Sequence, residues 1–175
     1  TMKKTIIDLF EDSVVKYGAK TFLLEKKHRA FEPTTYAETK EQALEIGAGL
    51  AAAGIRPGDK VAILSEGCNA WITSELGVFY AGAVSVPLSV KLEESNDLLF
   101  RMRHAEVRAL FVSKYQLSKI RRIRAELPQV EHIIVIGHIP LEAGETALGT
   151  LRRMGRDYLA ANREEFLAIG RSIRN

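Results

Sequence analysis

Four apolar runs separated by helix-like segments constrain the fold of this chain more than any other feature. The runs are VAIL at 61–64, AVSV at 83–86, ALFVS at 109–113 and HIIVI at 132–136. Helical patterns fill the intervals at 69–80, 95–104 and 114–127. Apolar strands joined by helices of this length are typical of right-handed crossovers in a parallel sheet with both faces covered. The pattern predicts a doubly wound, mainly parallel α/β fold with helices on both faces.

The segments that flank this alternation are also assigned from local signals. Thr5 with Asp8, and Thr35 with Glu38, match the capping box that begins a helix, and Gly18 and Gly54 are expected to end these two helices. The first helix has an apolar face made of Ile7, Phe10, Val14 and Tyr17. Residues 21–33 indicate two short extended pieces. Residues 138–146 predict a surface loop, and 147–169 predict one or two polar helices.

Composition limits the classes of protein to which the chain can belong. A chain of 175 residues, 46% hydrophobic and 27% charged, is sufficient for one globular domain with a sizeable core. The net charge of +3, with basic and acidic residues interspersed, argues against a nucleic-acid partner. The single cysteine, Cys68, fits a reducing compartment, and no stretch is apolar enough to span a membrane. We therefore expect a cytoplasmic protein.

One apparent nucleotide motif is rejected because of its position. GAGLAA at 47–52 matches the GxGxxA dinucleotide fingerprint in every letter. The fingerprint binds pyrophosphate only where its glycines follow a strand and open a helix, whereas these residues lie late in the helix that begins near Thr35. We expect small residues here to let the helix pack closely on the sheet.

No complete active site is visible in the sequence. The four histidines have no cysteine or carboxylate partners at the spacing of a zinc site, so no metal ligand is assigned. The basic segment 114–124 carries an apolar stripe of Leu117, Ile120, Ile123 and Leu127. This stripe suits docking on a sheet, and membrane contact is at most peripheral. No catalytic residue is assigned to this chain.

Two loops are the candidate ligand-binding segments. In open parallel sheets, ligands bind outside the carboxyl ends of the strands, where the loops diverge. The first loop, Ser65, Glu66 and Gly67, follows the first strand of the alternation, and the second, Pro87, Leu88 and Ser89, follows the next. Because every such strand must end in some loop, these segments could equally be connecting turns.

Taken together, the residues resemble the N-terminal part of the AMP-forming acyl-CoA synthetases, within the adenylate-forming superfamily. The resemblance rests on TTYAETKEQALEIGAGLAAAGIRPGDKVAILSEGCNAWITSELGVFYAGAVSVPLS and then EVRALFVS, in order and at matching spacing over most of residues 5–136. Leu88 and Ser89 follow Pro87 where peptide-synthetase adenylation domains carry an aspartate. Residues 151–166, LRRMGRDYLAANREEF, are similar to a helix of long-chain fatty acid CoA ligases.

The resemblance implies a two-step reaction in which a carboxylic acid attacks ATP to give an acyl-adenylate, and coenzyme A then displaces AMP. It implies ATP, Mg²⁺ and coenzyme A as cofactors and a fatty acid as substrate. The family's phosphate loop, Mg²⁺-handling glutamate, ribose-binding aspartate and C-terminal lysine do not occur in this sequence. Residues 1–175 are therefore interpreted as the N-terminal part of an AMP-binding domain that is inactive alone and whose exposed face could self-associate. The alternatives are a stand-alone, non-catalytic binding module and part of an aryl or other acid–CoA ligase.

Overall fold

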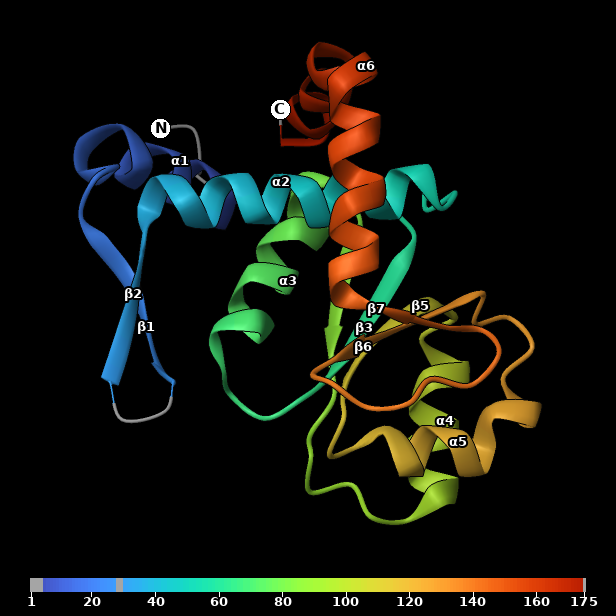
Figure 1. The fold of residues 1–175 in the computed structure, drawn as a ribbon. Helices are drawn as coiled ribbons and strands as arrows, with labels where there is room; N and C mark the ends of the chain where they lie inside the picture. Colours follow the sequence, from blue (N-terminus) through green and yellow to red (C-terminus); the bar gives the residue numbers. More distant parts are fainter. Residues whose placement is uncertain (1–4, 28–29, 175) are drawn as a thin grey trace.

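The computed structural model describes residues 5–27 and 30–174, which form one five-stranded parallel sheet, one two-stranded hairpin and the helices around them (Figure 1). The strands of the main sheet lie in the order β4-β3-β5-β6-β7. Their bounds are β3 Lys60–Leu64, β4 Val84–Pro87, β5 Val107–Ser113, β6 His132–Ile136 and β7 Glu145–Ala147. All four pairings in the main sheet are parallel. The predicted fold class is confirmed.

The central strands divide the protein into two hydrophobic cores because successive side chains of a strand point to opposite faces. Val61, Ile63 and Phe111 face the first core, together with residues of α1, α2, α3 and α6. Ala62 and Leu110 face the second core, which α4 and α5 cover. The helices are α1 Ile6–Tyr17, α2 Tyr36–Ala52, α3 Asn69–Tyr80, α4 Ser95–His104, α5 Leu117–Ile123 and α6 Leu148–Arg174. Both faces of β3 and β5 are therefore buried.

Helix α2 approaches α3 and α6 closely because glycines lie at the crossings. A Cβ on Gly47 would lie 2.6 Å from the Gly77 carbonyl oxygen of α3, and one on Gly155 of α6 would overlap the Glu45 carbonyl oxygen of α2. The expectation that residues 47–52 pack on the sheet is wrong. The small residues instead serve helix–helix contacts, with α6 crossing over α2 (Figure 1).

Local signals located most helix starts correctly. Both capping boxes are present. The carboxylates of Asp8 and Glu38 accept from the backbone N–H of Thr5 and Thr35, and the backbone N–H groups of Asp8 and Glu38 donate to the threonine hydroxyl oxygens in return. Tyr17 departs from the predicted buried face: it is 44% exposed, and its ring lies 6.2 Å from that of Tyr36. The hairpin of β1, Thr21–Lys27, and β2, Ala30–Thr35, matches the two predicted extended pieces.

The C-terminal third contains the main departures from the sequence prediction. Residues 145–147 form the edge strand β7, although 138–146 were expected to be loop. Helix α5 ends at Ile123 and continues only as the short 3₁₀ turn Arg124–Glu126. Helix α6 is continuous apart from a kink at Asn162, whose side-chain amide donates to the Tyr158 carbonyl oxygen.

Substitution at the α2–α6 crossing tests how far the fold depends on close helix contact. We expect Gly155→Ala to lower the free energy of unfolding by about 1–3 kcal/mol, because the added methyl must push the two helices apart. Urea unfolding measures the change. The matched control is Gly149→Ala in the first turn of the same helix, where a Cβ meets nothing within 4 Å. Equal effects of the two substitutions would contradict the account.

Candidate functional site

The topology places a switch point at the carboxyl ends of β3 and β5, and we call the loop residues at these two strand ends the crevice. The chain leaves β3 through α3 toward the first core and leaves β5 through α5 toward the second core. Neighbouring strands whose connections depart to opposite faces form the switch point at which open α/β sheets bind ligands. The residues that line this point come from 65–68 after β3 and from 113–116 at the end of β5.

A polar network joins the two loops across the switch point. The Gln116 amide donates to the Glu66 carboxylate at 2.5 Å, and the Ser65 hydroxyl donates to the Glu66 carbonyl oxygen at 3.0 Å. Ser65 is buried, and its oxygen lies 3.9 Å from the Cys68 sulfur. The network holds the first predicted loop in a defined position rather than leaving it as a free turn.

Two buried polar atoms of this network have no hydrogen-bond partner among the described residues. They are the Ser113 hydroxyl, on a residue that is 4% exposed, and the Gln116 side-chain oxygen. An unpaired buried polar atom costs free energy, so such atoms commonly indicate a bound water or ligand group. Because the Glu66 carboxylate lies beside them, the crevice presents hydrogen-bond acceptors.

Electrostatics around Glu66 favour the ionised carboxylate. Burial raises its pKa, but the Gln116 amide, the backbone of its own loop, the nearby Ser113 hydroxyl and the Lys119 ammonium together lower the pKa below the usual 4.5. The Ser113 hydroxyl lies near enough to the Glu66 carboxylate to lower its pKa, but it makes no hydrogen bond to it. The crevice therefore carries a negative charge at neutral pH.

The second predicted loop lies beside the first but has a different environment. Pro87 pairs with Ile63 at the end of the β3–β4 ladder, and the Leu88 N–H donates to the Ile63 carbonyl oxygen. Leu88 is buried in the second core, which gives its side chain a packing role. The Ser89 hydroxyl accepts from the Lys91 N–H and so stabilises a local turn.

The two loops contribute differently to the site. Ser65 and Glu66 belong to the crevice, and a Cβ on Gly67 would meet open space. The sequence analysis missed Ser113 and Gln116. Their signal was the polar SKYQ that directly follows ALFV, and it becomes informative only once β5 is placed next to β3.

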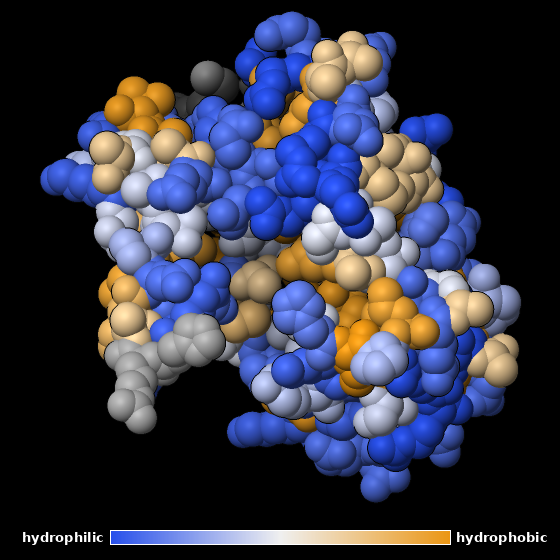
Figure 2. All heavy atoms as spheres, viewed as in Figure 1, coloured by the Kyte–Doolittle hydropathy of each residue, from blue (hydrophilic) through white to orange (hydrophobic). Residues whose placement is uncertain are grey.

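A second hollow lies at the carboxyl ends of β6 and β7. It is an open groove of about 690 Å³ between Gly137, His138 and the first turns of α6, and Arg152 and Arg156 line it. Both arginines bond the same Glu45 carboxylate, at 2.9 and 3.2 Å, so one carboxylate offsets one of their two positive charges. Figure 2 shows strongly hydrophilic residues along this part of the molecule. Arg153 also lines the groove and donates to the Thr150 hydroxyl, so the groove is polar and its arginines outnumber the carboxylate that they bond.

The described part of the chain has neither a cluster of metal-binding side chains nor a helix that could span a membrane. Within residues 5–27 and 30–174, no group of three or more histidine, cysteine, aspartate or glutamate side chains could hold a metal ion. His132 has a structural role, because its Nε2 lies 2.8 Å from the Ala53 carbonyl oxygen. No helix in the same residues is long and apolar enough to cross a membrane.

Fold and site together define a doubly wound α/β domain with its crevice at the switch point. The family described as AMP-binding enzyme matches residues 10–164. The chain therefore belongs to the AMP-binding enzyme family, and the resemblance found in the sequence is confirmed.

Two curated relatives illustrate the similarity. The chain is 29% identical over 145 residues to a long-chain-fatty-acid–CoA ligase of Thermus thermophilus, a match that covers 81% of this chain and 27% of that protein. It is 28% identical over 109 residues to a chloroplastic long-chain-fatty-acid–acyl-carrier-protein ligase of Arabidopsis thaliana, covering 62% and 15%. The chain thus spans less than a third of the length of either relative.

Solved structures agree with this assignment. An anthranilate CoA ligase in complex with anthranoyl-AMP superposes with a TM-score of 0.78 at 27% identity, over 87% of this chain and 28% of that one. A long-chain-fatty-acid–CoA ligase from Archaeoglobus fulgidus superposes with a TM-score of 0.74 at 18% identity, over 87% and 30%. The second match shows the fold alone.

Removing the unpaired hydroxyl tests whether the crevice is optimised for stability. At a pH low enough to protonate Glu66, we expect Ser113→Ala to raise the free energy of unfolding by about 1 kcal/mol, because a buried oxygen without a partner is lost and no stabilisation of the carboxylate is given up. The control is Ser118→Ala, one turn away on the exposed side of α5. Chemical denaturation of both variants measures the difference. Destabilisation by Ser113→Ala would show that the hydroxyl is satisfied in solution.

The direction of the Glu66 pKa shift predicts a pH dependence. A folded-state pKa below the unfolded value stabilises the fold above about pH 4.5, and this contribution disappears as the pH falls through the folded pKa. We expect Glu66→Gln to be less stable than the parent at pH 7 and equally stable at the acid end of a pH series of unfolding curves. Glu75→Gln is the control, and its effect on stability should have the opposite sign. Burial raises the Glu75 pKa, so the ionised carboxylate destabilises the fold as the pH rises. If the difference in stability between Glu66→Gln and the parent did not change with pH, the assigned negative charge of Glu66 would be contradicted.

Proposed function

We propose that residues 1–175 are the N-terminal part of a longer ATP-dependent, AMP-forming ligase that joins a fatty acid to coenzyme A through an acyl-adenylate. The observation that carries the proposal is the family match over residues 10–164, combined with coverage of only 27% of a fatty-acid–CoA ligase. The acceptors of two curated relatives are named as coenzyme A and acyl-carrier protein, and both names specify a long-chain fatty acid.

The substrate class has one supported alternative. The anthranilate CoA ligase superposes on 87% of this chain, and it is in complex with anthranoyl-AMP, an aromatic acyl-adenylate. An aromatic acid is therefore the second candidate substrate. The two candidates share the same reaction, which is adenylation of a carboxylate followed by transfer to a thiol.

The described residues do not fit the triphosphate of ATP. The crevice between β3 and β5 holds the ionised Glu66 carboxylate, which repels phosphate oxygens rather than binding them. In the neighbouring groove, Arg152 and Arg156 are bonded to Glu45, and Arg153 donates to the Thr150 hydroxyl. We therefore place ATP and Mg²⁺ binding outside this chain and derive no step of the reaction from its residues.

Two roles remain for the chain within the proposed enzyme. The first is scaffolding, because two complete cores support the sheet without any ligand. The second is one wall of a ligand site, formed by Ser65 and Glu66 with the residues that follow β5. We propose that the whole domain acts as a scaffold and that only the crevice residues contribute to a ligand site.

Pyrophosphate release tests the proposal directly. We expect the natural-length polypeptide expressed from the same gene to release pyrophosphate from ATP and Mg²⁺ only when a carboxylic acid is added. The 175-residue chain should release none, since positioning and electrostatic stabilisation of the phosphates are absent. Palmitate and anthranilate in parallel assays separate the two substrate classes.

Two results would overturn the proposal. A natural polypeptide that ends at residue 175 would favour a stand-alone binding module. A longer polypeptide that releases no pyrophosphate with any acid of either class would exclude the ligase activity.

A further inference from the structure

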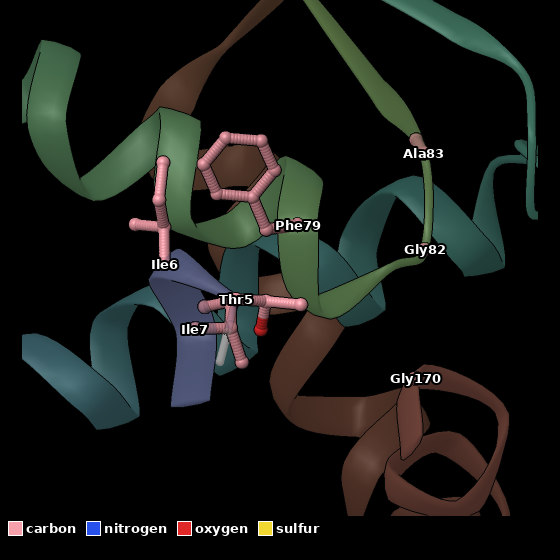
Figure 3. Close-up of a pocket in the computed structure, with 7 residues that line it drawn as sticks. All are labelled: Thr5, Ile6, Ile7, Phe79, Gly82, Ala83 and Gly170. Atoms are coloured by element: carbon pink, nitrogen blue, oxygen red, sulfur yellow. The ribbon is translucent and has the colours of Figure 1, made fainter. Parts of the chain in front are cut away.

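The main sheet has two edges, and they are built differently. Strand β4 forms the first edge, and Figure 3 shows its start, where Gly82 and Ala83 border an apolar hollow of about 300 Å³. The N–H groups of Val84 and Leu88 are directed toward β3, so alternation along the parallel ladder turns position 87 to the open side. Pro87 occupies this position and has no N–H to donate to a further strand. The sequence of β4 therefore weakens this edge as a pairing site.

At the other end of the sheet, β6 has no such protection in its own sequence. The segment HIIVIG at 132–137 contains no proline, lysine, arginine or acidic residue, and Ile133, Ile134 and Val135 are buried. An uncharged segment of this kind, rich in β-branched residues, pairs readily with copies of itself when its edge is exposed. In the strand order β5-β6-β7, the edge strand β7 lies between β6 and the open side. Strand β7 thus determines whether this edge of β6 is exposed.

Strand β7 is too short to be held firmly by pairing alone. Its three residues, Glu145–Ala147, are half-buried, and they belong to neither core. They pair with Ile133, Ile134 and Val135 of β6. A ladder of three residues provides few hydrogen bonds, and segments with few buried contacts open most easily. An additional attachment is needed to keep β7 on the sheet.

Arg121 of α5 supplies this attachment. Its guanidinium donates to the two carboxylate oxygens of Glu145 at 2.7 and 2.9 Å, and to the Pro140 carbonyl oxygen at 3.0 Å. The Glu145 side chain is 4% exposed, and the Glu142 N–H also donates to its carboxylate at 2.9 Å. The bonds from Arg121 hold the pKa of Glu145 below its usual value, so this carboxylate is ionised at neutral pH. Because two-bond pairs between arginine and a carboxylate are strong, Arg121 ties β7 and the loop before it to α5.

Without Arg121, an ionised carboxylate would remain at a position that is almost closed to water. A buried charge that loses its partner is strongly unfavourable. Glu145 regains water if β7 leaves the sheet, and this movement leaves both cores in place because β7 contributes to neither. Release of β7 would then expose the uncharged edge of β6.

We propose that β7 is a guard strand that prevents β6 from pairing with a second copy of the chain, and that the Arg121–Glu145 ion pair holds the guard strand in place. A very short, polar edge strand is itself a poor template for further pairing, so β7 ends the sheet without creating a new exposed edge of the same kind. This device belongs to the fold and does not depend on the proposed ligase reaction.

Hydrogen exchange followed by mass spectrometry tests the ion pair in the 175-residue chain. Arg121→Ala removes the cation, and Arg121→Ala combined with Glu145→Gln removes the buried charge as well. Arg163→Ala is the matched control, because Arg163 also donates to both oxygens of a glutamate, Glu41, at 3.3 and 3.4 Å, but that side chain is 54% exposed and stays hydrated. Circular dichroism and thermal unfolding establish that each variant is folded before exchange.

At low protein concentration, we expect the amides of 145–147 to exchange about tenfold or more faster in Arg121→Ala than in the parent chain, because exchange follows local opening. The amides of 60–64 in β3 should be unchanged. At higher concentration, light scattering should show that Arg121→Ala associates more than the parent and Arg163→Ala. The double variant should return toward the parent in both measurements, since a neutral amide can stay in place.

Three results would overturn the proposal. Unchanged exchange at 145–147 in a folded Arg121→Ala chain would show that the ion pair does not hold β7. Faster exchange without added association would show that β7 does not guard β6. Equal acceleration in Arg163→Ala would assign the effect to a general loss of stability. If Arg121→Ala does not fold, Arg121→Lys, which keeps the charge without the two-bond fork, is measured in its place with a smaller acceleration expected, and the same three results overturn the proposal.

Discussion

The pairing of β3 with β5 at the centre of the sheet is the constraint on which the rest of the structure depends. Both strands are buried on both faces, so their side chains must alternate between two separate cores. From β4 on one side of β3, the chain crosses over β3 through α4 to form β5 on the other side. The connection after β3 therefore lies on the face of the first core, and the connections after β4 and β5 lie on the face of the second. The same topology therefore produces the two cores and the crevice above them. In this domain, one strand order determines both the scaffold and the candidate site.

The central strands were predictable from sequence because their signal is local and strong. Runs such as VAIL and HIIVI are apolar throughout, as strands buried on both faces require. Strand β7 was missed because Glu145–Ala147 is short and polar, and it is placed by pairing with β6 and by the bond of Arg121 to Glu145. Those contacts join residues that are distant in sequence, and no local pattern reveals them.

The candidate site was predictable only in part, for the same reason. Ser65 and Glu66 could be named because they directly follow a strong strand, and the structure places them in the crevice. Leu88 occupies an equivalent position after β4 but turns into the second core. Gln116 reaches the site because β5 lies next to β3, and this strand order cannot be read from the sequence. Likewise, GAGLAA lies inside α2 as the sequence predicted, but the packing partners of its glycines, α3 and α6, were known only from the fold.

The central claim is that this domain folds with two complete cores and that phosphate chemistry lies elsewhere in the enzyme. Isothermal calorimetry of ATP and Mg²⁺ into the 175-residue chain, after circular dichroism has shown that the chain is folded, tests it most directly. The account predicts a cooperatively folded protein and no saturable heat of binding. Saturable binding with a dissociation constant in the low micromolar range, equivalent to about −8 kcal/mol, would contradict it and would place a phosphate site within these residues.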